Sequence, residues 1–228
     1  MSLGAISIDG GGFDRTIAVA SSHFCTAERQ YRTPLEYGGQ RTPTAQWTVT
    51  GAGAAVLEKR QFPPYITHIT TGKVIDFGVT DPNNMGGAMA PAAIDTLKAH
   101  FRDTKRSPKN YDLILTGDLG KVGREIVIDM MTAGGFDMEQ NYNDTGCMIY
   151  DFETQDVHAG GSGCGCVAVT LCGYVFEMMK KGELNDVLIL GTGALLSPTS
   201  SLQGESVPGI AHAISLSTTP GGGKNGLY

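Results

Sequence analysis

Glycine is spread through this chain in pairs and triplets, and these clusters limit the folds that the chain can adopt. The sequence holds 32 glycines, with clusters at positions 10–12, 38–39, 86–87, 134–135, 160–161 and 221–223. Because glycine has no Cβ atom, such clusters permit tight turns and a close approach of two backbones. Close approach is needed where strands pack on a central helix, and where backbone N–H groups surround a ligand. We therefore expect closely packed layers joined by short glycine turns.

Strand-like and helical segments alternate along the chain. Short apolar runs predict strands, and apolar residues at helical spacing predict helices. Strands are expected at 16–20, 47–57, 65–74, 111–116 and 186–190, and helices at 89–101, 121–132 and 167–181, with the end of another helix at 4–10. The 16–20 strand is expected to be buried, 21–46 to form a long loop, and 191–198 to be the loop after the 186–190 strand. This alternation is typical of an α/β fold with strands buried on both faces.

The charge and the cysteines exclude several classes of protein. The net charge is −6 and the basic residues form only short pairs, so no nucleic-acid partner is expected. No apolar run approaches the roughly 20 residues that span a bilayer, and no signal-peptide pattern is present. Five irregularly spaced cysteines predict reduced, cytoplasmic thiols. Cys164 and Cys166 lack the second ligand pair of a zinc site, so neither a metal nor a cofactor is expected.

The segment 160–166 is a glycine-rich turn that leads into the helix expected from residue 167. A helix N-terminus offers unpaired N–H groups and the positive end of the helix dipole, which suit a carboxylate or phosphate. A plain strand-to-helix turn would show the same pattern, and the run matches no nucleotide-binding fingerprint. From the pattern alone the two interpretations have equal weight.

Other candidates are single side chains. Asp118 follows the 111–116 strand, at the end where α/β sheets place ligands, although an aspartate there also caps helices. His158 precedes the glycine-rich turn and is more often structural than functional as a lone histidine. Cys25 has no setting that would lower its pKa, so it is a weak nucleophile candidate, with His23 as a possible partner.

Three segments together resemble the thiolase and 3-ketoacyl-synthase superfamily. The string TGAGAAVL at 50–57 resembles a strand of that superfamily, and DLILTGD at 112–118 resembles the strand that delivers its catalytic histidine. Residues 158–166, the helix after them and KGELNDVLILGTG at 181–193 resemble its asparagine loop, helix and final glycine-rich loop. The resemblance implies a layered α-β-α-β-α fold.

A closer resemblance is to the stage V sporulation protein AD family of spore-forming Firmicutes. It rests on TAERQ at 26–30, TAQWTVTGAGAA at 44–55, MAPAA at 89–93 and ALLSP at 194–198. The resemblance implies a dipicolinic-acid-binding component of the spore's dipicolinate uptake machinery. It also implies a place in the forespore, peripheral to the inner spore membrane, beside membrane subunits of the stage V sporulation A complex.

Two departures from the superfamily bear on activity. Its members extend further at the N-terminus, where the nucleophilic cysteine lies, and residues 4–13 resemble the end of that cysteine's helix. We therefore expect an incomplete N-terminal half at 1–62, a whole C-terminal half at 63–219, a disordered tail at 220–228 and a homo-oligomer. The segment GDLG at 117–120 stands where the superfamily carries His-Gln-Ala-Asn with its catalytic histidine, and GGSG at 160–163 stands where it carries the catalytic asparagine. Without those groups the oxyanion of a Claisen reaction is not stabilised, and no catalytic residue is expected.

The resemblance predicts a ligand site from these same residues. Ser162, Gly163 and Cys164 are expected to donate hydrogen bonds to the dipicolinate carboxylates, with Asp118 and His158 at the edge. Because Asp118 would repel a free dianion, it is alternatively a contact for calcium in a calcium–dipicolinate complex. Two other functions stay open: a degenerate acyltransferase that uses Cys25 or Cys164, and a scaffold subunit without a ligand.

Overall fold

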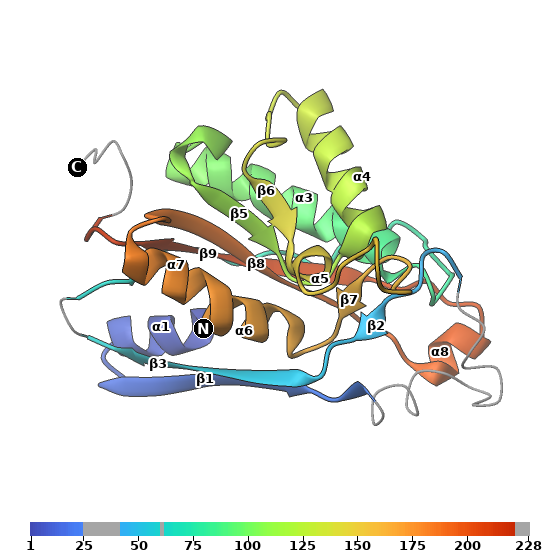
Figure 1. The fold of residues 1–228 in the computed structure, drawn as a ribbon, viewed down its shortest axis with the longest axis horizontal. Helices are drawn as coiled ribbons and strands as arrows, with labels where there is room; N and C mark the ends of the chain where they lie inside the picture. Colours follow the sequence, from blue (N-terminus) through green and yellow to red (C-terminus); the bar gives the residue numbers. More distant parts are fainter. Residues whose placement is uncertain (25–41, 60–61, 222–228) are drawn as a thin grey trace.

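A computed structural model describes residues 1–24, 42–59 and 62–221 of the chain. Its elements are α1 (Ser2–Asp9), β1 (Arg15–Ser22), β2 (Trp47–Thr48), β3 (Gly51–Glu58), β4 (Tyr65–Thr70), α3 (Met85–Thr104), η2 (Pro108–Asn110), β5 (Leu113–Thr116), α4 (Gly120–Ala133), β6 (Tyr142–Asp144), α5 (Thr145–Met148), β7 (Gly161–Ser162), α6 (Cys166–Thr170), η3 (Leu171–Val175), α7 (Phe176–Lys181), β8 (Asp186–Ala194), α8 (Pro198–Leu202) and β9 (Gly209–Ser217). Figure 1 shows them as stacked layers of strands and helices.

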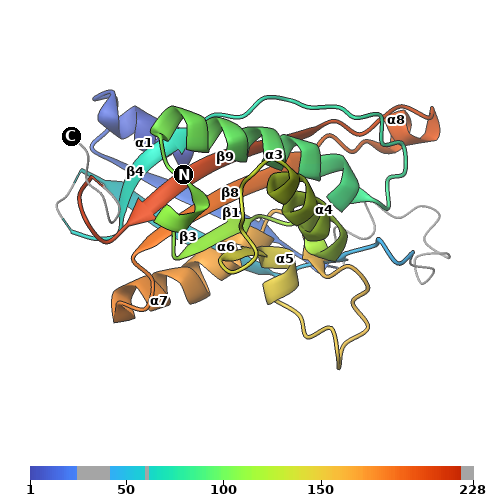
Figure 2. The same ribbon diagram turned by 90° about the horizontal axis from the view of Figure 1, so that it is seen from above.

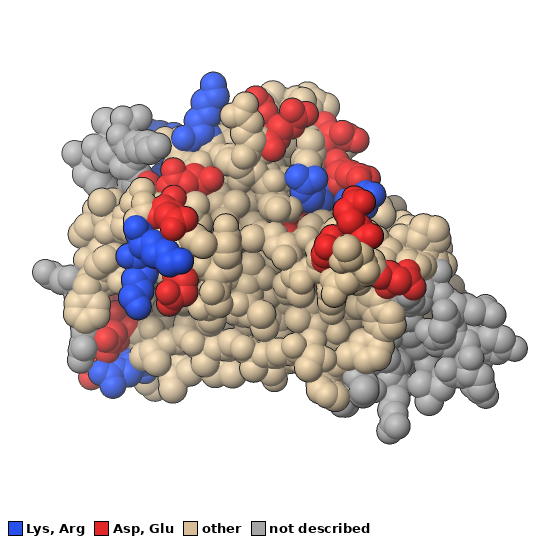
Figure 3. All heavy atoms as spheres, viewed as in Figure 1, with Lys and Arg blue, Asp and Glu red and all other residues tan. Residues whose placement is uncertain are grey.

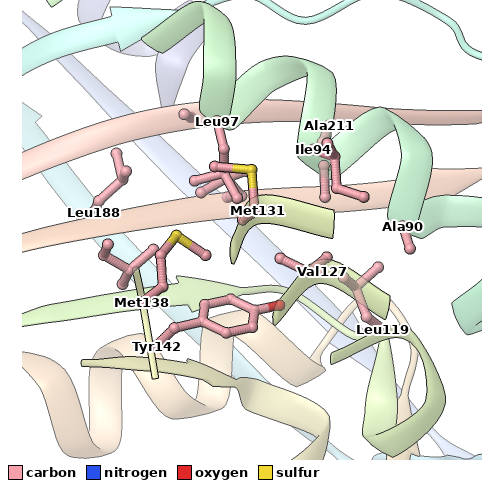
Figure 4. Packing of buried hydrophobic residues seen from close by; sticks show 14 of the residues in the cluster. Ala90, Ile94, Leu97, Leu119, Val127, Met131, Met138, Tyr142, Leu188 and Ala211 are labelled. Atoms are coloured by element: carbon pink, nitrogen blue, oxygen red, sulfur yellow. The ribbon is translucent and has the colours of Figure 1, made fainter. Parts of the chain in front are cut away.

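The main layer is a five-stranded mixed sheet in the order β4-β9-β8-β5-β6. β8 and β6 are parallel to β5, whereas β9 is antiparallel to both β8 and β4. Seen from above, α3 runs along β9 and β8 (Figure 2), and α4 packs against α3. The apolar side chains of these helices and strands interdigitate in the larger of two buried clusters, drawn in Figure 4.

The opposite face of this sheet is covered by α1 and by the helical run from α6 to α7 (Figure 1). Leu171, Val175 and Met179 of that run pack on Ile189 and Ile214 of the sheet in the second buried cluster. The helical run is continuous from Cys166 to Lys181 as predicted, but its central turn, η3, is π-helical.

Beyond these helices lies a two-stranded antiparallel sheet made of β1 and β3, which we call the ribbon. A Cβ atom at Gly53 would lie 2.5 Å from the carbonyl oxygen of Ala168, so glycine is needed where the ribbon meets α6. The order of layers is thus ribbon, helices, five-stranded sheet, helices. Among the described residues no helix covers the outer face of the ribbon.

Several expectations about elements are wrong. The 16–20 strand is not buried: Ile17 and Val19 of β1 are 66% and 67% exposed, because nothing described packs on that face. Residues 191–194 are not a loop but the end of β8, since they pair with β9. β9 itself was not expected. The 220–228 tail lies almost entirely outside the described residues, and the division into two halves stays a prediction.

Candidate functional site

The glycine-rich turn lies between β7 and α6 and is held by three neighbouring segments. β7 pairs in parallel with β2, so that Trp47 lies beside Gly161 and Thr48 beside Ser162. The amide of Gln46 donates to the carbonyl of Gly161 at 2.7 Å and to that of Asp118 at 2.9 Å. The hydroxyl of Ser22, at the end of β1, accepts from the N–H of Gly165 at 2.9 Å. The turn is therefore fixed in place by the ribbon and by β2.

Gly163, like Gly160 with its φ of +98°, is a position of this turn that favours glycine. Its φ is +107°, a backbone conformation that residues with a side chain rarely adopt. A Cβ atom there would also lie 3.2 Å from both Ser22 and Thr48. Ser162 and Gly163 are partly exposed and Cys164 is exposed, so this side of the turn faces solvent.

Asp118 joins the turn to the five-stranded sheet. Its Oδ2 accepts from the backbone N–H of Gly163 at 3.0 Å, and its Oδ1 accepts from the hydroxyl of Thr192 on β8 at 2.6 Å. Protein atoms surround the carboxyl group, although part of the residue reaches solvent. Burial raises the pKa of Asp118, and the hydrogen bonds from Thr192 and Gly163 oppose that rise. The expected proximity of Asp118 to the glycine-rich turn is thus observed.

Asp144, at the end of β6, is a second buried carboxylate in the same region. Its two oxygens accept from the backbone N–H groups of Leu119, Gly120 and Gly146 and from the hydroxyl of Thr116, at 2.7 to 2.9 Å. It therefore holds the turn that carries Asp118 at the start of α4. Burial, together with the nearby charge of Asp118, raises the pKa of Asp144 to about 7 in spite of these donors.

The thiols of the site differ in exposure. Cys166 is fully buried, with its Sγ 3.3 Å from the hydroxyl of Thr145. Burial raises the pKa of the Cys147 thiol to about 12 and that of Cys166 well above its ordinary value. Because the thiolate is the nucleophile, neither of these two cysteines is activated. Cys164 is exposed, and Cys25 lies outside the described residues.

His158 lies at the entry to the turn in a left-handed conformation, with φ of 47°. Its Nδ1 is 2.7 Å from the carbonyl oxygen of Thr42, and its Nε2 is 3.1 Å from the carboxylate of Asp156. These contacts hold the loop before the turn, whereas the contacts of Asp118 are with Gly163 and Thr192. The structure therefore brings Asp118, Ser162, Gly163 and Cys164 to one place and gives His158 different partners.

Residues 1–24, 42–59 and 62–221 contain no group of three His, Cys, Asp or Glu side chains that could hold a metal ion. In the same ranges no helix has the length and apolar character needed to cross a membrane.

Comparison with known proteins decides the family. The family model for stage V sporulation protein AD matches residues 1–217. The chain belongs to the stage V sporulation protein AD family. Stage V sporulation protein AD of Bacillus subtilis (strain 168) is 50% identical over 207 residues, which are 91% of this chain and 61% of that protein. The chain thus spans less than two thirds of the length of this family member.

Solved structures of other proteins share the fold of this chain. The 3-oxoacyl-(acyl carrier protein) synthase III of Pseudomonas aeruginosa PAO1 superposes with a TM-score of 0.55 at 13% identity, over 95% of this chain and 61% of that one. OleA of Xanthomonas campestris gives a TM-score of 0.55 at 14% identity, over 95% and 59% of the two chains. The predicted thiolase-like α/β fold is confirmed, and the chain covers about three fifths of each neighbour.

Proposed function

We propose that this chain is a non-catalytic dipicolinate-binding component of the dipicolinate uptake machinery of the spore. The observation that carries the proposal is the bond between the Asp118 carboxylate and the N–H of Gly163. It means that the glycine-rich turn presents a backbone donor in a geometry that a carboxylate accepts. Dipicolinate is a rigid ring with two carboxylates, and Ser162 and Cys164 flank this donor on the solvent side.

The same contacts favour binding over catalysis. The segment 117–120, which the resemblance aligns with the segment of the catalytic histidine, holds no histidine and carries Asp118, which is hydrogen-bonded to Thr192 and Gly163. The buried thiols of Cys147 and Cys166 have raised pKa values, so they are poor nucleophiles at neutral pH. Stabilisation of an oxyanion would need donors aimed at a developing charge, and a carboxylate in that place opposes such a charge.

The family resemblance supports the remaining parts of the proposal. The protein would act in the forespore, at the inner spore membrane, beside membrane subunits of the stage V sporulation A complex. Dipicolinate would bind free or as its calcium complex, in which Asp118 would be the calcium contact. His158 would border the site through its loop rather than contact the ligand directly.

Calorimetric titration of dipicolinate tests the proposal, with isophthalate as the control ligand that lacks the ring nitrogen. We expect saturable binding of dipicolinate that isophthalate does not reproduce. Ser162→Trp should abolish the signal by filling the solvent side of the turn, whereas Thr199→Trp, at an exposed position of α8, should leave it unchanged.

Three results would contradict this assignment. If Ser162→Trp bound dipicolinate as tightly as the parent does, the ligand would not bind at the glycine-rich turn. Absence of dipicolinate binding by the folded chain would favour a scaffold subunit. Transfer of an acyl group from a coenzyme A thioester to Cys164 would favour the degenerate acyltransferase.

A further inference from the structure

The donor that a ligand carboxylate would use is already occupied by a carboxylate of the protein. Oδ2 of Asp118 lies 3.0 Å from the backbone nitrogen of Gly163, a distance typical of an N–H···O hydrogen bond. The other oxygen of Asp118 is held separately, by the hydroxyl of Thr192 at 2.6 Å. The hydrogen bond from Thr192 therefore anchors Asp118 to β8. The hydrogen bond from the N–H of Gly163 could instead be made to a ligand.

The surroundings make an exchange at this position feasible. Asp118, Gly163 and Thr192 are each partly exposed as residues, so solvent lies close to this bond although protein atoms surround the carboxyl group itself. Gly191, the residue before Thr192, is exposed, and a Cβ atom built there would meet no other atom within 4 Å. Because consecutive residues of a strand point to opposite faces, this opening lies on the other face of β8, and solvent access near the anchored oxygen is that of the partly exposed Thr192.

The ionisable groups around Asp118 are acidic rather than basic. Asp144, which holds the other side of the 117–120 turn, interacts electrostatically with Asp118, whereas the raised pKa of the Cys166 thiol leaves that group uncharged at neutral pH. Arg124 of α4 donates to the side chain of Asn143 rather than to Asp118. A second carboxylate that entered this site would therefore meet negative charge, and two adjacent carboxylates cannot both stay ionised at low energetic cost.

We infer that Asp118 is an internal competitor for the ligand: a ligand carboxylate replaces Asp118 on the N–H of Gly163, and the released oxygen of Asp118 takes up one proton from solvent. This inference rests on the proposed function and concerns the regulation of the same site. The exchange breaks one hydrogen bond and forms another, and the added proton offsets one of the two negative charges of the dipicolinate dianion. The raised pKa of Asp118 agrees with uptake of a proton there.

Dipicolinate binding measured between about pH 6 and 8 tests the inference, because ordinary carboxyl groups of the ligand are ionised throughout that range. We expect the affinity to fall with rising pH, by up to about tenfold per pH unit. Calorimetry in two buffers with different ionisation enthalpies should show uptake of up to one proton per ligand bound. Asp118→Asn should bind at least as tightly at pH 8 as the parent does at pH 6, with a weaker dependence on pH and a smaller proton uptake, because only Asp144, whose pKa is about 7, then titrates beside the site.

Two further variants make the test specific. Asp129→Asn removes an exposed carboxylate of α4 and should keep the parent's pH dependence and proton uptake. Thr192→Val removes the donor to Oδ1, which raises the pKa of Asp118 further, and should move the fall in affinity to higher pH. This variant keeps the inference testable if Asp118→Asn does not fold, as judged by thermal unfolding.

The possible failures are distinguishable. Binding that is independent of pH and takes up no proton overturns the competitor role while the proposed function stands. Absence of binding at every pH, in the parent and in folded Asp118→Asn, overturns both. Binding by Asp118→Asn alone at pH 8 supports the inference directly.

Discussion

At the scale of single residues, His100 is enclosed in the core between α3 and the five-stranded sheet. Its Nδ1 lies 2.8 Å from the hydroxyl of Thr70, and its Nε2 lies 2.7 Å from that of Tyr111 and 3.2 Å from that of Ser215. The side chain is fully buried. Burial, together with the charges of His68 and Arg106, lowers the pKa of His100 to about 4.

This histidine should make the fold sensitive to acid. The unfolded chain binds a proton at His100 below about pH 6.5, and the folded chain only below about pH 4, so stability falls as the pH drops through this window. The full loss from one group is on the order of 3 kcal/mol. Urea unfolding at several pH values should therefore show a weaker loss of stability between pH 6.5 and 4 in His100→Gln than in the parent.

His158→Gln is the matched control, because His158 lies at the surface beside Asp156. It should keep the parent's slope in the same window. Asp144 contributes with the opposite sign: its raised pKa favours the folded state at low pH, and that contribution is lost between about pH 4 and 7. The contribution of His100 is the difference between the slopes of stability against pH of His100→Gln and of the parent. Equal slopes would contradict the role of His100 in the sensitivity to acid.

At the scale of elements, the packing of α3 on β9 depends on small side chains. The residues of β9 that face this helix include Ala211 and Ala213, both fully buried. The hydroxyl of Thr96 in α3 donates directly to the backbone carbonyl of Ala211 at 2.9 Å. The helix therefore lies close to the backbone of the strand, with little room for a longer side chain.

Ala213→Leu should consequently destabilise the fold by overpacking this contact, by about 1–3 kcal/mol. Urea unfolding measures the loss as a lower midpoint at an unchanged slope. The same substitution at the exposed Ala54 of β3 should change stability by less than about 0.5 kcal/mol. Similar values for the two variants would show that α3 tolerates a larger residue at this position.

The same small residues explain what could and could not be predicted from the sequence. α3, α4 and β5 were predicted because their apolar residues recur with a clear period or form a clear run. β9 was missed because its helix-facing positions hold Ala and Ser, which carry little of the β-branched signal that marks a strand. Asp144 was missed because β6 has three residues and no apolar run. Asp118 was found because it follows a recognisable strand, but its anchor Thr192 was assigned to a loop.

At the scale of the whole molecule, the outer face of the ribbon is apolar and is covered by none of the residues that the structure describes. Ile17 pairs with Val56, which is 60% exposed, and Val19 pairs with Ala54 on the same face. In Figure 3 the lower margin, along which β1 and β3 run in the same view, shows almost no charged side chains except at its left end. Exposed apolar faces of this kind mark sites of association.

We expect this chain to form homo-oligomers through the ribbon, in agreement with the oligomer expected from the sequence. Sedimentation velocity should show association that increases with protein concentration, and Ile17→Lys should shift the protein toward the monomer. Leu202→Lys, which adds the same charge at an exposed leucine of α8, should leave the association unchanged. A parent that stays monomeric across the concentration range, or equal effects of the two variants, would rule out this interface.

The order of strands in the five-stranded sheet also sets when the sheet can be completed during synthesis. β9 is the last strand along the described chain, yet it lies between β4 and β8 and is the strand with which β4 pairs. Because the chain is synthesised from its N-terminus, β4 leaves the ribosome long before β9. The N–H and C=O groups of β4 therefore have no strand to pair with while α3, β5 and β8 emerge. Until residues 209–217 leave the ribosome, β4 stays detached from the sheet, and its backbone is open to pairing with other nascent chains.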